Sequence, residues 1–333
     1  MRANTIVART LNAPDSNDPL RGHLLRAVVG PTAVGKSALA LELAERSDCE
    51  IVALDSMQVY RGMDVGTAKP TAAERARVRH HMLDLVSPNE RYDVQRYMRD
   101  VGLVLDDIHA RGKRALFVGG TGFYLKVLTS GLFDGPDVDL ELRARLMRRV
   151  DAEGLTVLHM ELAGVDPESA ARIHPNDTKR VVRGLEVYMQ TGATLSSQRT
   201  QWGETPGTSK RCIVGLTTAT DALDRRIHER TAAMMSAGWP DEAARIQGAS
   251  GFGSTAVQAL GYAEALALHD GCLRFEEAVE ITWRATRQFA RKQRTWYRKF
   301  EDIVWFDVGL KDVAQNRAER DEFVLAALRA LDL

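Results

Sequence analysis

Residues 30–37 read Gly30-Pro31-Thr32-Ala33-Val34-Gly35-Lys36-Ser37 and match the pattern G-x-x-x-x-G-K-[ST]. A short apolar run at 24–29 precedes them, and the helix-forming stretch SALALELAER (37–46) follows. The glycines let successive backbone N–H groups turn inward, and the helix N-terminus and the lysine add positive charge. The segment is therefore predicted to bind a phosphate group, with the Ser37 hydroxyl suited to a Mg²⁺ ion shared with the phosphates.

Further apolar runs of strand type lie at 50–54, 115–118, 212–216 and 303–306. Helical stretches separate the first three strands, and this alternation predicts a parallel sheet with right-handed crossovers. The expected fold class is α/β, a P-loop NTPase-like parallel sheet flanked by helices.

The region between 130 and 208 has a different character. Its helical stretches at 140–153, 167–173 and 178–191 are not interrupted by a strand of buried type. Stretches rich in glycine, proline, serine and threonine bound it. We expect a flexible N-terminal tail at 1–22, a catalytic α/β core formed by 23–129 and 209–333, and a mostly helical insertion domain at 130–208.

The composition excludes several classes of protein. With 44% hydrophobic and 27% charged residues, the chain is of the soluble globular type. Lys plus Arg and Asp plus Glu both number 45, which excludes a uniformly basic nucleic-acid binder but leaves one basic face possible. No apolar run approaches the roughly 18 residues that a membrane span needs, and no secretory signal begins the chain.

The three cysteines, at 49, 212 and 272, form no C-x-x-C pair. A disulfide scaffold and a cysteine-rich zinc site are therefore not expected. We expect a cytoplasmic protein that has no membrane partner and, because nothing in the sequence argues for an oligomer, a monomer.

Two further strand ends carry polar residues. Asp55 and Ser56 follow the second strand, and Gly119-Gly120-Thr121-Gly122 follows the third. Because open α/β sheets bind ligands at the carboxyl ends of their strands, both segments are candidates for the site. Asp55 could be a Mg²⁺ ligand, a general base or a turn cap. Thr121 could donate a hydrogen bond into the site or belong to a simple turn.

The stretch 283–300 contains no acidic residue. Its arginines at 284, 287, 291, 294 and 298 share one helical face, whereas Phe289, Trp296 and Phe300 lie opposite and are expected to anchor the helix to the core. A stripe of one charge favours phosphate contacts, the alternative being an ordinary exposed helix. A smaller basic cluster lies in the insertion, at Arg172, His174, Lys179, Arg180 and Arg183.

Five segments occur in one order: GPTAVGKS (30–37), DSMQVYRGMDVGTAKPT (55–71), VGGTGFYLKVL (118–128), RIHPNDTKRVVRGLEVY (172–188) and ATRQFARKQRTWYRK (285–299). Together they resemble the tRNA isopentenyltransferase (dimethylallyltransferase) family of bacteria. The similarity spans roughly residues 24–306.

The resemblance implies transfer of a dimethylallyl group from dimethylallyl diphosphate to N6 of the adenosine 3′-adjacent to the tRNA anticodon. Residues 30–37 would hold the diphosphate with Mg²⁺, including Ser37 as a metal ligand partly through water. Asp55 would accept the N6 proton. The implied catalytic residues are Asp55, Thr121, Lys36 and Arg287, the last reaching the diphosphate from the far side.

The implied partner is the tRNA anticodon stem-loop. The residues that the resemblance assigns to tRNA binding are Asp55, Ser56, Met57, Gln58, Thr121, Arg143, Lys179, Arg180, Arg183, Gln258, Gly261, Tyr262, Arg291, Lys292, Arg294, Trp296 and Arg298. The late loop departs from the family pattern, because Gln258–Ala263 has no basic residue around its Gly-Tyr pair.

Three other functions compete with this interpretation. An adenylate isopentenyltransferase of the cytokinin type would need neither the insertion nor the arginine stripe for so small an acceptor. A P-loop kinase or NTPase shares residues 30–37 and could place Asp55 on Mg²⁺. A non-catalytic RNA-binding protein would explain the arginines but leave the phosphate-binding loop without a role.

Overall fold

The computed structural model describes residues 20, 22–131, 135–199, 210–309 and 317–333. The chain divides into two compact units, one formed by 1–128 with 208–333 and the other by 129–207. These boundaries lie within two residues of the predicted core and insertion. Most of the predicted tail lies outside the described residues. Leu20 does not fit that prediction, because it is buried in the main core.

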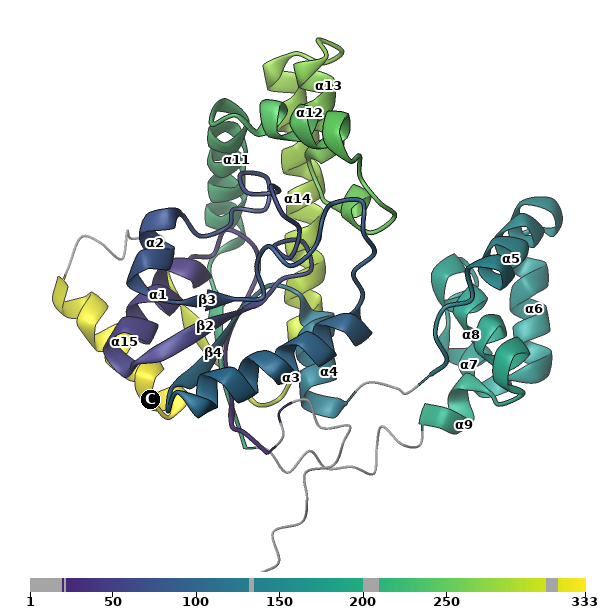
Figure 1. The fold of residues 1–333 in the computed structure, drawn as a ribbon, viewed down its shortest axis with the longest axis horizontal. Coiled ribbons are helices and arrows are strands. Elements are labelled where there is room, and N and C mark those ends of the chain that lie inside the picture. The colour runs from purple at the N-terminus through teal and green to yellow at the C-terminus, as the bar shows by residue number, and fades with distance from the viewer. Residues whose placement is uncertain (1–19, 21, 132–134, 200–209, 310–316) are drawn as a thin grey trace, which may run out of the picture. The chain divides into compact units, whose positions relative to one another are not determined.

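A six-stranded parallel sheet forms the centre of the larger unit (Figure 1). The strand order is β3-β2-β4-β1-β5-β6. The strands are β1 (Leu25–Val29), β2 (Cys49–Leu54), β3 (His80–His81), β4 (Arg114–Gly119), β5 (Arg211–Thr217) and β6 (Ile303–Asp307). The predicted parallel sheet and its five predicted strands are confirmed. The two-residue strand β3 was not predicted.

The register brings three chain segments to one edge of the sheet. Gly119 at the end of β4 pairs with Val29 of β1 on one side and with Leu54 of β2 on the other. The segments that follow these strands, 30–37, 55–58 and 120–122, therefore leave the sheet side by side. The three sequence motifs predicted to bind the ligand thus meet at this edge.

Helices cover both faces of the sheet. On one face α1 (Lys36–Ser47) and α15 (Arg317–Leu331) bury their apolar sides in a shared cluster. On the other face α3 (Val94–Ala110) and α4 (Gly122–Ser130) contribute to a second cluster. The helix α2 (Ala72–Arg77) begins with a capping box between Thr71 and Glu74.

The remaining helices of this unit follow β5. They are α11 (Thr220–Ser236), α12 (Trp239–Ala249), the short 3-10 helix η1 (Ala256–Gln258), α13 (Tyr262–His269) and α14 (Phe275–Tyr297). Trp239, Ala243 and Ile246 of α12, Tyr262 and Ala265 of α13, and Ala278 and Val279 of α14 join the same cluster as α3.

The smaller unit is built from helices alone in its described residues. These are α5 (Leu140–Glu153), α6 (Leu155–Val165), α7 (Pro167–Arg172), α8 (Thr178–Thr191) and α9 (Leu195–Arg199). It has a hydrophobic cluster of its own. Aspartates cap three of its helices, α5 by Asp139, α7 by Asp166 and α8 by Asp177. The helix α6 was not predicted.

Among the helices that the structure describes, none combines the length and the apolar character that a membrane span requires.

Gly119 is required by the close approach of β2 and β4. A Cβ atom at this position would lie 2.1 Å from the Leu54 carbonyl oxygen, which belongs to rigid backbone. We expect Gly119→Ala to lower the free energy of unfolding by about 1–3 kcal/mol, the usual range for overpacking. Urea unfolding of the full chain measures this effect.

Gly248→Ala is the matched control, because Gly248 lies in α12 with open space around its Cβ position. Alanine favours a helix over glycine, so this variant should be unchanged or more stable by up to about 1 kcal/mol. Equal stability of the two variants would contradict the argument.

Candidate active site

The phosphate loop, residues 30–37, has the backbone that its glycines allow. Gly35 has a φ of 102°, and a Cβ atom on Gly30 would lie 2.6 Å from the Leu216 carbonyl oxygen. The Lys36 ammonium donates a hydrogen bond to the Pro31 carbonyl at 2.7 Å. The lysine thus folds back over the loop that the sequence predicts to bind phosphate.

Two adjoining cavities open at this edge of the sheet, with volumes of about 340 Å³ and 130 Å³. Lys36 and Ser37 line the smaller cavity. Apolar side chains line part of the larger one, among them Ile227, Met234, Trp239 and Leu260. Both cavities are lined by Thr32, Asp55, Thr67, Gly120, Arg230, Phe289 and Gln293.

Asp55 lies at this shared wall, and Thr121 lines the larger cavity. Asp55 Oδ1 accepts hydrogen bonds from the backbone N–H groups of Met57 at 2.8 Å and Gln58 at 3.3 Å. Its Oδ2 has no hydrogen-bond donor among the described residues and is available to a ligand. Thr121 Oγ1 accepts from Ser56 N at 3.2 Å, which leaves the hydroxyl proton able to point elsewhere.

Arg230 of α11 is a site residue that sequence reasoning missed. It lines both cavities, and its charge acts on Lys36 and on Asp55. A signal existed, because Arg230 lies three residues after Ile227 and seven after Leu223, on the apolar face of its helix. A charged residue that shares a helix face with buried apolar residues indicates a polar site inside the protein.

Burial and the neighbouring cation change the acidity of the loop lysine. Burial, reinforced by the charge of Arg230 and opposed by that of Asp55, lowers the pKa of Lys36 to about 7. Burial also lowers the pKa of Arg230, against the opposing effect of Asp55. Two cations and one carboxylate therefore face one small space, an arrangement that a diphosphate would neutralise.

Arg287 does not occupy the position predicted for it. Its guanidinium forms an ion pair with Asp224 at 2.5 Å and lies over the Trp283 ring, and it lines neither of these two cavities. The prediction that Arg287 reaches the diphosphate is wrong for this structure. Arg230 of α11, in contrast, lines both cavities.

The arginine stripe on α14 is less cationic than its sequence indicates. Arg284 pairs with Glu280 at 2.6 Å, so that it and Arg287 both have acidic partners outside the basic segment 283–300. Arg294 donates to the Thr220 hydroxyl. Arg291 and Arg298 are exposed, and exposed Lys292 lines the larger cavity.

The aromatic residues of α14 do not all anchor it. Phe289 is 41% exposed and lines both cavities, so the predicted anchoring role is wrong there. Trp296 packs its indole ring against Gly122, where a Cβ atom would lie 2.1 Å from it. The buried face is instead formed by Ala278, Val279, Thr282, Ala290, Gln293 and Tyr297.

Gln293 connects three segments of the site, although no sequence motif indicated this role. Its Oε1 accepts a hydrogen bond from Thr32 N at 2.9 Å, and its Nε2 donates to the Gly120 carbonyl at 2.8 Å. A Cβ atom on Gly120 would lie 2.3 Å from this Nε2 atom. Helix α14 is thereby fixed to the phosphate loop and to the end of β4.

The other predicted RNA contacts divide between the cavities and the interior. Ser56 and Met57 line the larger cavity together with exposed Gln258, and Gln58 lines the smaller one. Tyr262 is buried and donates its hydroxyl to Glu242, so it cannot contact RNA as predicted. Gly261 is also buried, with its Cβ position occupied by the Trp239 ring.

In the smaller unit, the predicted RNA contacts are partly engaged within the protein. Arg143 and Arg183 both form ion pairs with the fully buried Glu186. Arg180 pairs with Asp177 at 2.7 Å. Lys179 and Arg180 remain exposed, whereas Arg143 and Arg183 have a structural role that the sequence did not indicate.

The donor set suits a hydrated Mg²⁺ ion only when phosphate oxygens are present. No group of three or more His, Cys, Asp or Glu that could hold a metal ion occurs among the described residues. The Ser37 hydroxyl and the Asp55 carboxylate line the same small cavity and are oxygen donors of the kind this ion prefers.

The low pKa of Lys36 predicts proton uptake when a diphosphate binds. Above pH 7 the lysine of the ligand-free protein is mostly neutral, and a bound anion favours its charged form. Binding of inorganic diphosphate should thus be accompanied by proton uptake at Lys36 that is larger at pH 8 than at pH 7, and the affinity for diphosphate should fall as the pH rises above about 7.

Titration calorimetry in two buffers of different ionisation enthalpy measures this uptake. The Lys36→Met variant is the control, because it retains the protons that belong to the diphosphate itself. Equal proton uptake by the variant and the wild-type protein would contradict the assignment.

Comparison with known proteins places this site in a family. The family described as IPP transferase matches residues 58–300, and the one described as isopentenyl transferase matches residues 23–87. The tRNA dimethylallyltransferase of Geobacter metallireducens is 44% identical over 285 residues, which are 84% of this chain and 91% of that protein.

Solved structures agree with these matches. The full-length tRNA isopentenylpyrophosphate transferase of Bacillus halodurans is 35% identical, with a TM-score of 0.63, over 93% of this chain and 98% of that one. A eukaryotic dimethylallyltransferase acting on tRNA is 27% identical, with a TM-score of 0.74, over 91% and 80%. From these matches and from the motifs gathered at one edge of its sheet, this chain belongs to the IPP transferase family.

Proposed function

We propose that this protein is a transferase that moves a dimethylallyl group from dimethylallyl diphosphate to tRNA. The acceptor atom is N6 of the adenosine 3′-adjacent to the anticodon, and diphosphate is released. Curated relatives are named for this activity. The structure of this protein supports the proposal through its pair of adjoining cavities.

The observation that carries the proposal is the shared wall between a polar and a partly apolar cavity. Lys36 and Ser37 line the polar one, whereas Ile227, Met234 and Trp239 line the other. A nucleoside triphosphate needs no apolar cavity beside its terminal phosphates. A short branched hydrocarbon attached to a diphosphate needs both environments, with its reactive carbon at the boundary.

Asp55 and Arg230 stand at that boundary and suit the two charges that develop in the reaction. As N6 of adenine attacks C1 of the dimethylallyl group, the C1–O bond breaks and its electron pair leaves with the diphosphate. Lys36, Arg230 and the N–H groups of the phosphate loop stabilise the negative charge on that leaving group. Asp55 accepts the N6 proton, which makes the delocalised amine an effective nucleophile.

A Mg²⁺ ion would be held by the Ser37 hydroxyl, by water and by the diphosphate, with Asp55 close by in the same cavity. When bound, the ion adds to the neutralisation of the leaving group. Lys36 and the phosphate loop would hold the diphosphate, and the apolar residues of the larger cavity would exclude water from the hydrocarbon.

The anticodon stem-loop is the proposed macromolecular partner. Arg291 of α14, Arg298 just after its end and Lys292 at the cavity are suited to its phosphates, and so are Lys179 and Arg180 of the smaller unit. The target adenosine must leave its stack to enter the larger cavity. Because the acceptor is tRNA, we place the protein in the cytoplasm.

Incubation with dimethylallyl diphosphate, Mg²⁺ and unmodified tRNA, followed by nucleoside mass analysis, tests the proposal. We expect adenosine in tRNA to gain one dimethylallyl group, and AMP offered in place of tRNA to gain none. Modification of AMP would indicate the cytokinin-type enzyme. Consumption of ATP without any prenylated product would indicate a kinase or NTPase.

Asp55→Asn tests the proposed base. The amide keeps the shape of the side chain and its acceptor for Met57 N, but it cannot take the proton. We expect single-turnover rates to fall by about 10²- to 10⁴-fold, the usual worth of a general base. Binding of tRNA, measured by filter retention, should be nearly unchanged. A rate close to wild type would exclude Asp55 as the base.

A further inference from the structure

The carboxylate of Glu242 is buried without a cation to pair with it. Its side chain lies in α12 and is 3% exposed, and none of the described Lys, Arg or His residues forms an ion pair with it. A buried charge of this kind is costly unless dipoles surround it. The structure supplies four of them.

Each carboxylate oxygen of Glu242 accepts two hydrogen bonds. Oε2 accepts from the backbone N–H groups of Asp64 at 2.9 Å and Val65 at 2.8 Å. Oε1 accepts from Gly66 N at 3.1 Å and from the Tyr262 hydroxyl at 2.7 Å. Three consecutive backbone N–H groups thus converge on one anion, and this fixes the turn at 64–66.

This turn leads directly to the walls of the active site. Gly66 and Thr67 line the larger cavity, and Thr67 also lines the smaller one. The Gln58 side chain donates from Nε2 to the carbonyl oxygens of Thr67 at 3.1 Å and Ala68 at 3.4 Å. The orientation of the Gln58 amide, which faces the site, depends on where the 64–66 turn places these carbonyls.

Aromatic rings pack around Glu242 and against the same turn. The Tyr262 ring packs edge-on against Trp239, with ring centroids 5.5 Å apart, and Trp239 in turn packs against Gly66. A Cβ atom on Gly66 would lie 2.2 Å from the indole nitrogen, and one on Gly261 would lie 2.1 Å from the indole ring. The Gly261-Tyr262 pair therefore supports the loop from behind and does not face RNA.

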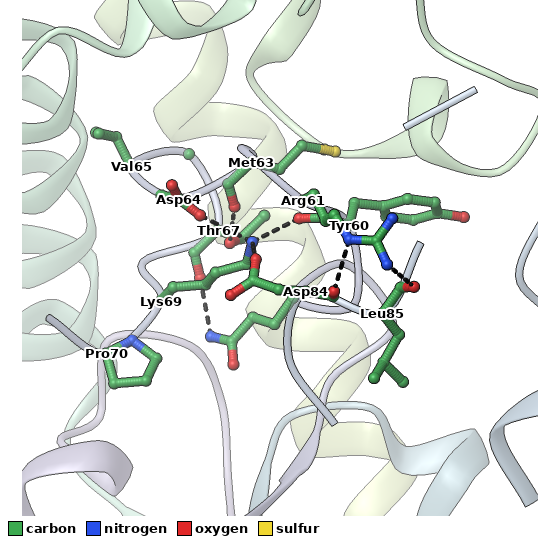
Figure 2. A network of polar contacts seen from close by, with 12 residues as sticks. Tyr60, Arg61, Met63, Asp64, Val65, Thr67, Lys69, Pro70, Asp84 and Leu85 are labelled. Atoms are coloured by element: carbon green, nitrogen blue, oxygen red, sulfur yellow. Dashed lines mark hydrogen bonds and ion pairs between the residues drawn. The ribbon is translucent and has the colours of Figure 1, made fainter. Parts of the chain in front are cut away.

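A buried cation, Lys69, also holds the same loop (Figure 2). The Lys69 ammonium donates to the Tyr60 carbonyl at 2.5 Å and contacts Asp64 at 2.8 Å and Asp84 at 2.6 Å. Its side chain is 1% exposed. Loop 58–69 is thus fixed by two buried charges, Glu242 at residues 64–66 and Lys69 between Tyr60 and Asp64. Of the two, Glu242 is the one that comes from a distant helix.

We propose that Glu242, supported by Tyr262, is a positioning residue for the tRNA acceptor. It fixes the 64–66 turn and with it Gly66 and Thr67, which line the larger cavity that the target nucleotide enters. The Gln58 amide, bonded to the carbonyls of Thr67 and Ala68, is oriented by the same turn. This inference rests on the proposed transfer to tRNA. Glu242 of α12 and Tyr262 of α13 would thus help to position the tRNA acceptor without contacting RNA themselves.

Glu242→Gln, Tyr262→Phe and a matched control test the proposal by steady-state kinetics with tRNA and dimethylallyl diphosphate. The control is Glu50→Gln, because Glu50 is likewise a buried carboxylate of this unit, bonded to Arg111 and His81, but lies near the opposite end of β2. Melting temperatures are recorded for every variant.

We expect Glu242→Gln to lower kcat/KM for tRNA by about 10- to 100-fold, because an amide group then faces backbone donors. The KM for dimethylallyl diphosphate should change by less than about twofold, since the phosphate loop is untouched. Tyr262→Phe leaves three donors and should cost about 3- to 10-fold. Glu50→Gln should lower the melting temperature without changing kcat/KM.

A double-mutant cycle with Gln58→Leu tests the proposed route. If Glu242 acts through Gln58, adding Glu242→Gln to the Gln58→Leu variant should cost less than about threefold more. A full additional loss would overturn that route. Equal losses of kcat/KM and of melting temperature in the Glu242→Gln and Glu50→Gln variants would reduce Glu242 to a stabilising residue.

Two outcomes remain to be separated. If Glu242→Gln does not fold, Tyr262→Phe decides, and an unchanged kcat/KM for tRNA in that variant overturns the proposal. Failure of the wild-type protein to prenylate tRNA would overturn the proposed function itself, before any variant is compared.

Discussion

The meeting of three parallel strands at Gly119 is the constraint on which the site depends. Because β4 lies between β1 and β2, the phosphate loop and Asp55 are separated by a whole strand. They can face one cavity only if the end of that strand carries no side chain. Two consecutive glycines meet this requirement, the first against the Leu54 backbone and the second against the Gln293 amide. The proposed reaction thus depends on two residues without side chains at the carboxyl end of the central strand β4.

Charge in this protein is arranged in two different ways. In the cavities, Lys36 and Arg230 outnumber Asp55, so that an anionic ligand completes the balance. In loop 58–69, the buried ions are satisfied by the protein itself, by backbone dipoles around Glu242 and by two carboxylates around Lys69. The first arrangement favours binding, and the second favours rigidity. They lie side by side because the loop forms a wall of the cavity.

Much of this architecture follows from local sequence. The five longer strands are mostly apolar. The phosphate loop is a motif between a strand and a helix, so that the strands and the loop were both predictable from local sequence. The strand β3 was not, because its two residues pair with β2 only through the tertiary fold. The partner of Arg287 lies 63 positions away at Asp224, and the burial of Tyr262 depends on Glu242 in another helix. Contacts of this kind are absent from any local pattern, and they decided which predicted residues reach the cavities.

The two units also differ in how their stability is organised. The insertion leaves the larger unit after α4 and returns before β5, and it has a hydrophobic cluster without a member from the sheet. Segments that share a hydrophobic core unfold together, so the two units of this chain are expected to unfold in two separate transitions. A donor that binds only at the sheet edge would raise the melting point of its own unit, whereas a ligand gripping both would couple them. The change in each unit's melting temperature, measured by calorimetry, would therefore show which unit a substrate binds.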